Sequence, residues 1–449
     1  MARTGPRVGL TGRLEQLAAS ARVPVFAIAG SGARDAVQDL RLRSEIRILD
    51  TPKAASILVV AGPIADVHAG ALARIHDTLP HPRATVLWAP EGALASLLPA
   101  VDPVVAAGDP VAAAVATYRD LVLGRRPSEP ALLPDVDPAE WRGVGPYGQG
   151  GSAMTGGTPY GRPMAELGPD PDGLRLDVVP VTVGPFFPRF PSGLVLDIRF
   201  SGDLVLEAAI HEGTVEPLVG PPVGLPRAAL RPFLRALTEP VPIAELELAR
   251  ARDHLRWLAD ALLAHGLPAL GARSLRLAQR VQPGDGGTVR RLARLIGWTQ
   301  VTRWSTRGVG RVSADDLAGL GAGPVARAAG LVEDVRLDDP AYRSLGFEPV
   351  IRASGDAAAR WSVRMAEIAQ SLDLAARAGD ARTSPIGRVE SPRGRLEPGN
   401  AASARLLELV PQLLRETEWG DAVATVVSLD LDLDEAARAE ELAAVEAVA

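Results

Sequence analysis

Short apolar runs alternate with amphipathic segments through residues 23–121. The runs VPVFAIAG (23–30), EIRILD (45–50), ASILVVAG (55–62) and ATVLWAP (84–90) have the length and apolar character of buried strands. Helical patterns lie between them, and a closing helix is predicted from Asp109 to Leu123. Strands that alternate with helices form a mostly parallel sheet covered on both faces. We therefore predict an α/β domain over residues 1–123.

Residues 124–173 are rich in proline and glycine and have almost no apolar periodicity, which predicts an extended linker. No strand precedes its glycines and no Lys-Ser/Thr pair follows them, so a phosphate-binding loop is not favoured.

An α+β domain is predicted over residues 174–449. Period-two alternation up to His211 indicates a small antiparallel sheet, and later helical patterns indicate a bundle. Residues 382–400 are predicted to be a loop. After Ser428, aspartate and leucine alternate. This alternation is typical of one strand with a polar face in water, with a carboxylate site for a cation as the alternative.

Asp356 to Arg377 is predicted to be a long helix with one apolar stripe. Another face carries Arg360, Arg364, Glu367 and Gln370. Periodicity leaves open whether this face meets solvent, a partner or an inward network of ion pairs.

The composition excludes several classes of function. The chain has 449 residues, a net charge of −6 and no cysteine. The charge argues against nucleic-acid binding, and the lack of cysteine excludes thiolate-held iron–sulfur clusters, cysteine-bound nickel and disulfides. The N-terminus lacks an apolar signal core, and no apolar run of about 18 residues could span a membrane. We expect a cytoplasmic protein that can dock on a membrane complex.

The turn Gly30-Ser31-Gly32 follows a predicted strand and resembles the start of a dinucleotide loop. The third glycine of that motif is replaced by Asp35, whose carboxylate would repel a pyrophosphate. A tight strand–helix turn is favoured, and nucleotide binding stays as an alternative.

The stretch from Arg307 to Leu374 resembles the large subunit shared by respiratory complex I and the membrane-bound nickel–iron hydrogenases. The matching residues, in one register, are Gly323-Pro324, Arg327, Gly330, Asp334, Arg336, Pro340, Tyr342, Phe347, Gly355-Asp356, Arg360, Arg364-Met365, Glu367 and Gln370-Ser371.

An upstream helix resembles the same family through Glu247, Arg250 and His254. His254 has no second histidine or carboxylate three or four residues further along, so a structural histidine is favoured over a metal ligand.

The N-terminal domain resembles the small subunit of complex I, which holds the terminal iron–sulfur cluster. The stretches ILDTPKAASILVVAGPI and LPHPRATVLWAPEGA carry this resemblance. The cluster cysteines of that family fall on Ser31, Gly32, Gly92 and Gly108. None of these residues can hold iron.

The large-subunit family also has a G-P-x-H-P turn whose histidine contacts the quinone headgroup. Phe187 stands at the position of that histidine. Phenylalanine neither donates nor accepts the proton that quinone reduction needs. Core packing is favoured for this side chain, with an apolar quinone pocket as the alternative.

Together the resemblances imply a fusion of a small-subunit-like domain with a large-subunit-like domain. We expect a non-redox structural or coupling subunit of a complex I-like or hydrogenase-like ion-translocating complex. It would lie on the inner face of the cell membrane, with antiporter-like and other membrane subunits as partners. Because the cluster-ligand positions and the quinone histidine are lost and the chain has no cysteine, we expect no iron–sulfur cluster and no nickel–iron centre, and bound quinone is not favoured. The alternative is a subunit of the NADH-quinone oxidoreductase type that binds quinone or NAD in a remodelled cavity.

Overall fold

The computed structural model describes residues 10–89, 103–135, 166–169, 173, 175–212, 214, 231–435, 437 and 439. Its N-terminal part contains a five-stranded sheet in the order β2-β1-β3-β4-β5, with every pair parallel. The strands are β1 (Val23–Ala29), β2 (Ile46–Leu49), β3 (Ile57–Ala61), β4 (Ala84–Trp88) and β5 (Val104–Val105). The parallel sheet is therefore confirmed, and β5 is an edge strand that the sequence did not predict.

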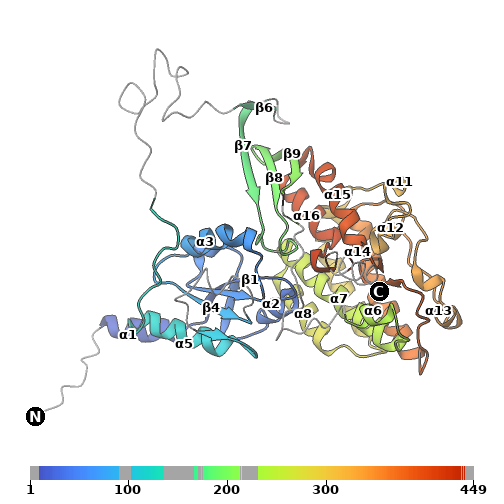
Figure 1. Ribbon diagram of the computed structural model, residues 1–449, viewed down its shortest axis with the longest axis horizontal. Helices are drawn as coiled ribbons and strands as arrows, with labels where there is room; N and C mark the ends of the chain where they lie inside the picture. The colour runs from blue at the N-terminus through green and yellow to red at the C-terminus, as the bar shows by residue number, and fades with distance from the viewer. Residues whose placement is uncertain are drawn as a thin grey trace, which may run out of the picture.

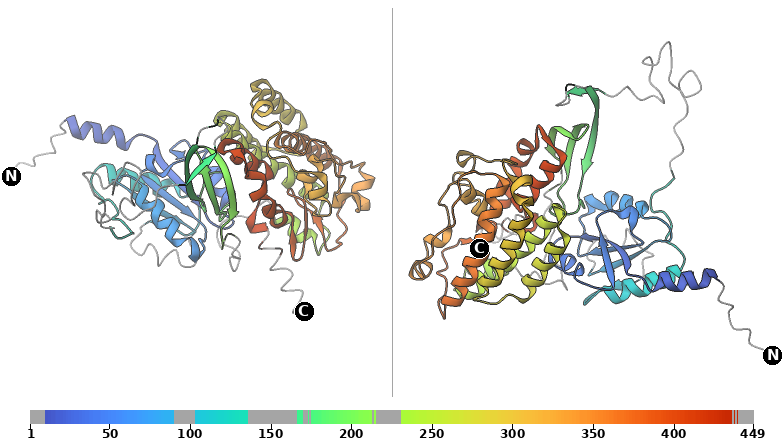
Figure 2. Two further views of the ribbon diagram at one scale, coloured as in Figure 1. Left: turned by 90° about the horizontal axis from the view of Figure 1, so that it is seen from above. Right: turned by 180° about the vertical axis from the view of Figure 1, so that it is seen from behind.

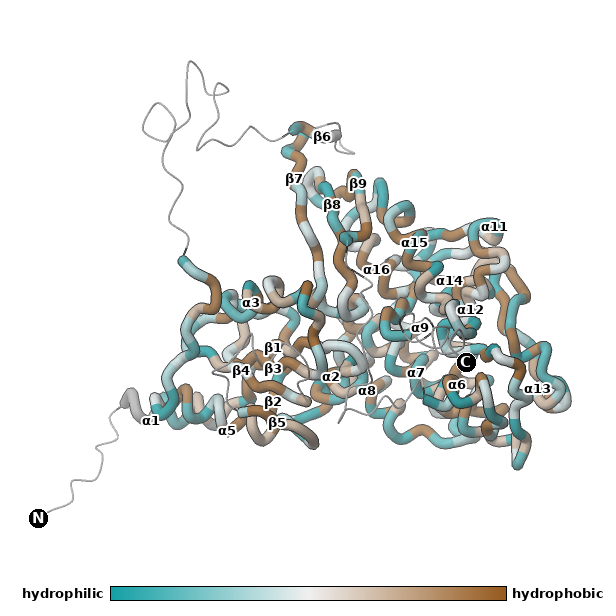
Figure 3. Tube along the Cα trace, in the orientation of Figure 1, coloured by the Kyte–Doolittle hydropathy of each residue, from teal (hydrophilic) through white to brown (hydrophobic). Residues whose placement is uncertain are grey.

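Helices cover both faces of this sheet (Figure 1). The covering helices are α2 (Arg34–Leu40), α3 (Ala69–Thr78) and α5 (Val111–Val122), with the short 3-10 turns η1 (Pro52–Ala54) and η2 (Asp66–His68). Helix α1 (Leu10–Ala19) lies against α5. Val25 packs in the same core as Leu121, whereas Phe26 packs with Leu72 on the opposite face. Because side chains alternate along a strand, β1 is apolar on both faces. Figure 3 shows these strands as hydrophobic.

A second, antiparallel sheet stands between the two parts of the molecule (Figure 1). Its strand order is β13-β9-β8-β7-β6. The strands are β6 (Leu167–Pro169), β7 (Arg175–Val183), β8 (Leu196–Ser201), β9 (Leu204–Ile210) and β13 (Thr417–Glu418). The predicted antiparallel meander is confirmed, and β13 joins it from far along the chain.

The rest of the described chain is mainly a helical bundle, visible in the right view of Figure 2. The longer helices are α7 (Ile243–Ala264), α8 (Pro268–Arg280), α9 (Gly286–Thr299), α14 (Ala357–Arg377), α15 (Ala402–Leu414) and α16 (Trp419–Leu429). The shorter ones are α6 (Arg231–Ala236), α10 (Val301–Thr306), α11 (Ala314–Leu317), α12 (Gly323–Ala328), η4 (Val335–Leu337) and α13 (Pro340–Ser344). Trp257 of α7 and Trp361 of α14 meet in the core of this bundle, with ring centroids 5.3 Å apart.

Two local predictions were wrong. The predicted loop at 382–400 contains a small sheet of β10 (Val389–Glu390), β11 (Arg395–Glu397) and β12 (Asn400–Ala401). The alternating segment after Ser428 is not a strand. Helix α16 continues through Leu429, and Asp430 then takes a left-handed conformation with φ of 56° and ends the helix. Asp430 is buried rather than facing water, because arginines surround its carboxylate.

The domain boundaries at residues 123 and 174 stay predictions, and residues 136–165 and 170–172 of the predicted linker lie outside the described residues. In the part of the chain that the structure describes, no helix is long and apolar enough to cross a membrane.

Candidate functional site

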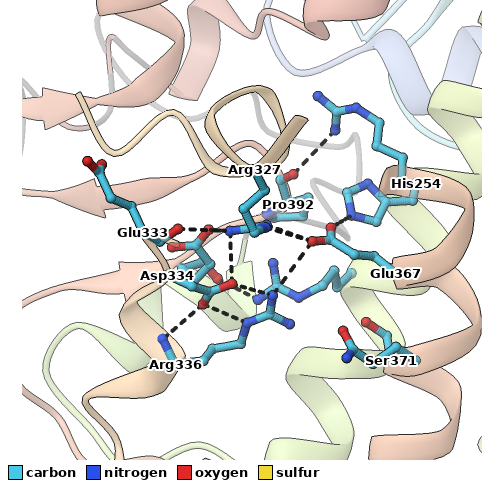
Figure 4. Close-up of polar contacts among 12 residues, drawn as sticks. His254, Arg327, Glu333, Asp334, Arg336, Glu367, Ser371 and Pro392 are labelled. Carbon is cyan, nitrogen blue, oxygen red and sulfur yellow. Dashed lines mark hydrogen bonds and ion pairs between the residues drawn. The ribbon is translucent and has the colours of Figure 1, made fainter. Parts of the chain in front are cut away.

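Arg327 of α12 lies at the centre of a buried network of ion pairs (Figure 4). Its guanidinium lies 2.8 Å from a carboxylate oxygen of each of Glu367, Asp334 and Glu390. Arg327 and Glu367 are completely buried. Since a buried charge is costly unless it is paired, these carboxylates allow Arg327 to remain charged in the core.

Glu247 of α7 is a second centre in the same network. Its carboxylate accepts hydrogen bonds from the hydroxyls of Tyr342 at 2.8 Å and Ser371 at 2.6 Å. Arg250 and Arg336 lie 3.3 Å and 3.4 Å away. Burial alone would raise the pKa of Glu247, but these two arginines and the two hydroxyls hold the pKa below its usual value. Glu247 is therefore ionised.

Arg336 joins the two centres. It also contacts Asp334 at 2.7 Å, and Asp334 in turn contacts Arg327. Its guanidinium lies 4.1 Å from the centre of the Phe347 ring. The network thus ties α7, α12, η4, α14 and β10 together.

His254 contacts the network through Glu367, with 3.1 Å between Nε2 and the carboxylate (Figure 4). Burial lowers the pKa of His254 to about 4, although Glu367 opposes the shift. The ring is therefore neutral near pH 7, and Nε2–H donates to Glu367. Its Nδ1 has no hydrogen-bond partner among the described residues. The described residues contain no group of three or more histidine, cysteine, aspartate or glutamate side chains that could hold a metal ion.

The arginine face of α14 points inward. Arg364 lies 3.2 Å from Asp430, and Arg360 donates to the carbonyls of Gly310 and Gly355. Periodicity left open whether these arginines face solvent, a partner or an inward network of ion pairs. In the structure they are buried and face inward.

Two other residues of this stretch lie outside the network. Asp356 caps α14 by accepting the N–H of Ala359 at 2.9 Å. Gln370 is half-buried and donates to the carbonyl of Glu348.

Asp430 connects the bundle to the N-terminal part. Besides Arg364, it lies 3.5 Å from Arg34 of α2 and 3.6 Å from Arg393. Arg34 also contacts Asp260 at 3.2 Å. Sequence reasoning did not bring Asp430, Arg34 and Asp260 together. Residues 34 and 430 are almost 400 positions apart, so no local pattern relates them.

A small cavity of ≈ 70 Å³ lies at this junction. The charged residues that line it are Arg34, Asp35, Asp253, Arg393, Asp432 and Asp434. Burial raises the pKa of Asp253 to about 6, and one oxygen of this carboxylate has no hydrogen-bond partner among the described residues. Nearby, burial raises the pKa of Glu435 to about 7, although Arg393 opposes the shift. The junction therefore holds two buried carboxyls that titrate near neutral pH.

The turn after β1 closes on this junction. The Ser31 hydroxyl donates to one oxygen of the Asp434 carboxylate, and the Gly32 N–H donates to the other at 2.6 Å. Gly108 lies on an exposed turn before α5, and Gly92 lies outside the described residues. Of the three described positions, the structure thus brings Ser31 and Gly32 to the junction but not Gly108. Hydroxyl and glycine do not fit a thiolate-held cluster.

Phe187 packs in an aromatic group, with its ring centroid 4.7 Å from that of Phe190 and 5.6 Å from that of Trp419. It also lines a cavity of ≈ 90 Å³ with Phe186 and Arg34. Ligand pockets usually enclose roughly 300 Å³ or more, so this cavity is small for a quinone headgroup and its binding contacts.

Comparison with known proteins relates part of the bundle to a known family. Residues 286–404 match the respiratory-chain NADH dehydrogenase 49 Kd subunit, and we call them the 49 kDa segment. This segment contains Arg327, Glu367 and Glu390. It confirms the resemblance of the bundle to complex I. The helix that carries Glu247 and His254 precedes this segment, so its resemblance to the large subunit stays a prediction. The N-terminal part also lies outside the segment, so its resemblance to the small subunit stays a prediction as well.

Curated relatives match this chain over stretches of 96 and 89 residues. An NADH-quinone oxidoreductase subunit of Salinispora arenicola is 45% identical over 96 residues, which are 20% of this chain and 25% of the relative. The corresponding subunit of Sinorhizobium medicae is 39% identical over 89 residues, 19% of this chain and 22% of the relative. The chain thus spans about a quarter of the length of these relatives.

A chain in the structure of the membrane-bound sulfane sulfur reductase, an archaeal respiratory membrane complex, is also similar. The identity is 19% and the TM-score 0.40, with 58% of this chain and 99% of that chain covered. A TM-score of this size does not establish a common fold.

Proposed function

We propose that this chain is a non-redox structural or coupling subunit of a complex I-like or hydrogenase-like ion-translocating membrane complex. It lies at the inner face of the cell membrane, beside antiporter-like and other membrane subunits. It carries no iron–sulfur cluster, no nickel–iron centre and no quinone. The 49 kDa segment supports its place in a complex of this kind.

The contact of Asp434 with Ser31 and Gly32 carries the non-redox part of the proposal. In the small-subunit family that the N-terminal part resembles, this turn would supply two cluster ligands. Here a carboxylate from the other domain accepts both donors of the turn, and the chain has no cysteine. A contact that joins two domains serves a scaffold, whereas an electron carrier would need sulfur ligands.

The buried ion network supports the structural role. Replacing one member of a buried ion pair leaves its partner charged and unpaired, so such a network holds one arrangement of the helices. Arg327, Glu247 and Arg336 fix α7 against α14 through fully buried contacts. This arrangement suits a part that braces or transmits a conformational change.

A second candidate is an oxidoreductase-type subunit that binds quinone or NAD in a remodelled cavity. The observation in its favour is the cavity beside Phe186 and Phe187, which combines aromatic rings with Arg34. Its small volume is against this candidate.

Ligand titration separates the two candidates. The complex purified with this chain would be titrated calorimetrically with NAD, NADH and a short-chain ubiquinone, in the parent and in Phe187→Arg. We expect the Phe187→Arg profile to match the parent, because the cavity that Phe187 lines is small for these ligands. A saturable signal that Phe187→Arg abolishes would support the oxidoreductase candidate instead.

A further inference from the structure

Residues 271–311 form a strongly basic region in an acidic chain. They contain nine arginines, no lysine and a single acidic residue, Asp285, whereas the whole chain has a net charge of −6. The nine arginines are Arg273, Arg276, Arg280, Arg290, Arg291, Arg294, Arg303, Arg307 and Arg311. All nine are exposed. We call the surface of α8, α9, α10 and the residues that follow to Arg311 the basic surface.

The charges of the basic surface are hardly neutralised from within the described chain. Arg290 pairs with Asp373 at 3.8 Å, and the other eight arginines form no ion pair with a described residue. Exposed arginines elsewhere do find carboxylates: Arg235 contacts Glu239, and Arg388 contacts Asp338. Like charges at this density repel one another, so a negatively charged surface from outside would stabilise them.

Two tryptophans stand on the same surface. Trp298, near the end of α9, is 78% exposed, and Trp304 of α10 is 80% exposed. The guanidinium of Arg303 lies 5.9 Å from the centre of the Trp304 ring. Large aromatic side chains are rarely this exposed, and arginine and tryptophan dominate the binding energy of protein interfaces.

Trp298 is not needed to hold α9 in place. The apolar residues of α9 that pack into the bundle are Val289, Leu292 and Ile296, all buried. The outward face of α9 then has arginines and Trp298, without the continuous apolar stripe that an interfacial membrane helix inserts into lipid. Two separate aromatic anchors among arginines suit recesses in a protein surface better than an acyl layer.

We infer that the basic surface docks an acidic surface of a partner protein, with Trp298 and Trp304 entering apolar recesses rimmed by carboxylates. The inference rests on the proposed function for the kind of partner, which is another subunit of the same complex. The olive-coloured helices α9 and α10 lie at the outer edge of the bundle in the left view of Figure 2, where a second protein can approach.

Photocrosslinking in the native host tests this docking. A photoreactive phenylalanine would replace Trp298 or Trp304 in the full chain, with Val332, which is 60% exposed outside the basic surface, as the control position. We expect one protein partner at 298 and 304, absent at 332, with aspartate or glutamate in the crosslinked peptide. The double charge reversal Arg291→Glu and Arg294→Glu should reduce the crosslink at least tenfold, and Arg291→Lys with Arg294→Lys should retain it.

A charge swap makes the test specific. Changing the acidic residues of the crosslinked peptide to arginine should restore the crosslink to the charge-reversed chain. Adducts with lipid or nucleic acid alone, or a protein crosslink that charge reversal leaves undiminished, would overturn the inference.

The same samples separate this inference from the proposed function. Membrane subunits recovered with the chain, but no crosslink at 298 or 304, would overturn the docking surface and leave the proposed function standing. An acidic partner crosslinked at both positions, with no membrane subunit recovered, would support the docking surface and overturn the proposed function.

Discussion

At the scale of single residues, Arg327 tests the buried network most simply. Arg327→Met leaves Glu367, Asp334 and Glu390 without their shared cation. Because breaking a buried ion pair leaves uncompensated charge, we expect a loss of about 3–5 kcal/mol in the free energy of unfolding. Urea denaturation followed by circular dichroism measures this loss.

The matched control for that variant is Arg388→Met. Arg388 pairs with Asp338 at 3.0 Å on the exposed surface. An exposed pair contributes about 0–1 kcal/mol, so this variant should unfold almost as the parent does. Equal losses in the two variants would contradict the stabilising role assigned to the network.

Glu435 makes stability depend on pH. Burial raises its folded-state pKa to about 7 from 4.5, so between these values the folded state binds more protons than the unfolded state. The contribution of Glu435 to the free energy of unfolding therefore falls as pH rises from about 4.5 through 7. Glu435→Gln removes this dependence and should be more stable than the parent by roughly 2–3 kcal/mol at pH 8, with little advantage at pH 4.

Urea denaturation at pH 4, 6 and 8 checks this prediction, with the exposed Glu408→Gln as the control. A Glu435→Gln advantage that is the same at all three pH values would show that the pKa of Glu435 is the same in the folded and the unfolded protein, and would contradict the prediction.

The sequence predicted the kinds of residues in the network but not its full membership. Spacing placed Arg364 and Glu367 on a polar face of one helix, and resemblance pointed to Arg327. Glu390 and Asp430 could not be identified, because the first lay in a predicted loop and the second in a predicted strand. Their roles depend on arginines that only the tertiary fold brings close.

At the scale of elements, the turn between β1 and α2 depends on a residue more than 400 positions away. Asp434→Asn removes the charge from the hydrogen bonds with Ser31 and Gly32. Hydrogen bonds to charged groups contribute about 1.5–3 kcal/mol, so amide exchange in this turn should increase roughly 10- to 100-fold.

Hydrogen–deuterium exchange with mass spectrometry measures that change. Asp177→Asn, on an exposed position of β7, is the control and should leave the turn unchanged. If Asp434→Asn also leaves it unchanged, Asp434 does not hold the two parts of the molecule together.

Elements with strong local patterns were the predictable ones. The four longer parallel strands and the long helix α14 followed from apolar runs and helical spacing. The short strands β5, β10, β12 and β13 have two residues each and no periodicity to detect. They form because longer neighbours supply their hydrogen-bond partners.

At the scale of the whole molecule, charge is unevenly distributed. The junction between the two parts is rich in carboxylates, with Asp253, Asp430 and Asp434 close together, whereas the basic surface on α8 to α10 has hardly any. At the junction, arginines of the same chain pair with Asp430. The arginines of the basic surface have hardly any carboxylate partners within the described chain. This distribution fits one member of a larger assembly.

The central claim is membership of a membrane complex without an electron-transfer role. Native mass spectrometry of a gentle detergent extract, purified through a tag on this chain, tests it most directly. We predict recovery with antiporter-like membrane subunits, and a mass for this chain that includes no iron–sulfur cluster. Recovery without any such membrane subunit, or with a cluster bound to this chain, would contradict the claim.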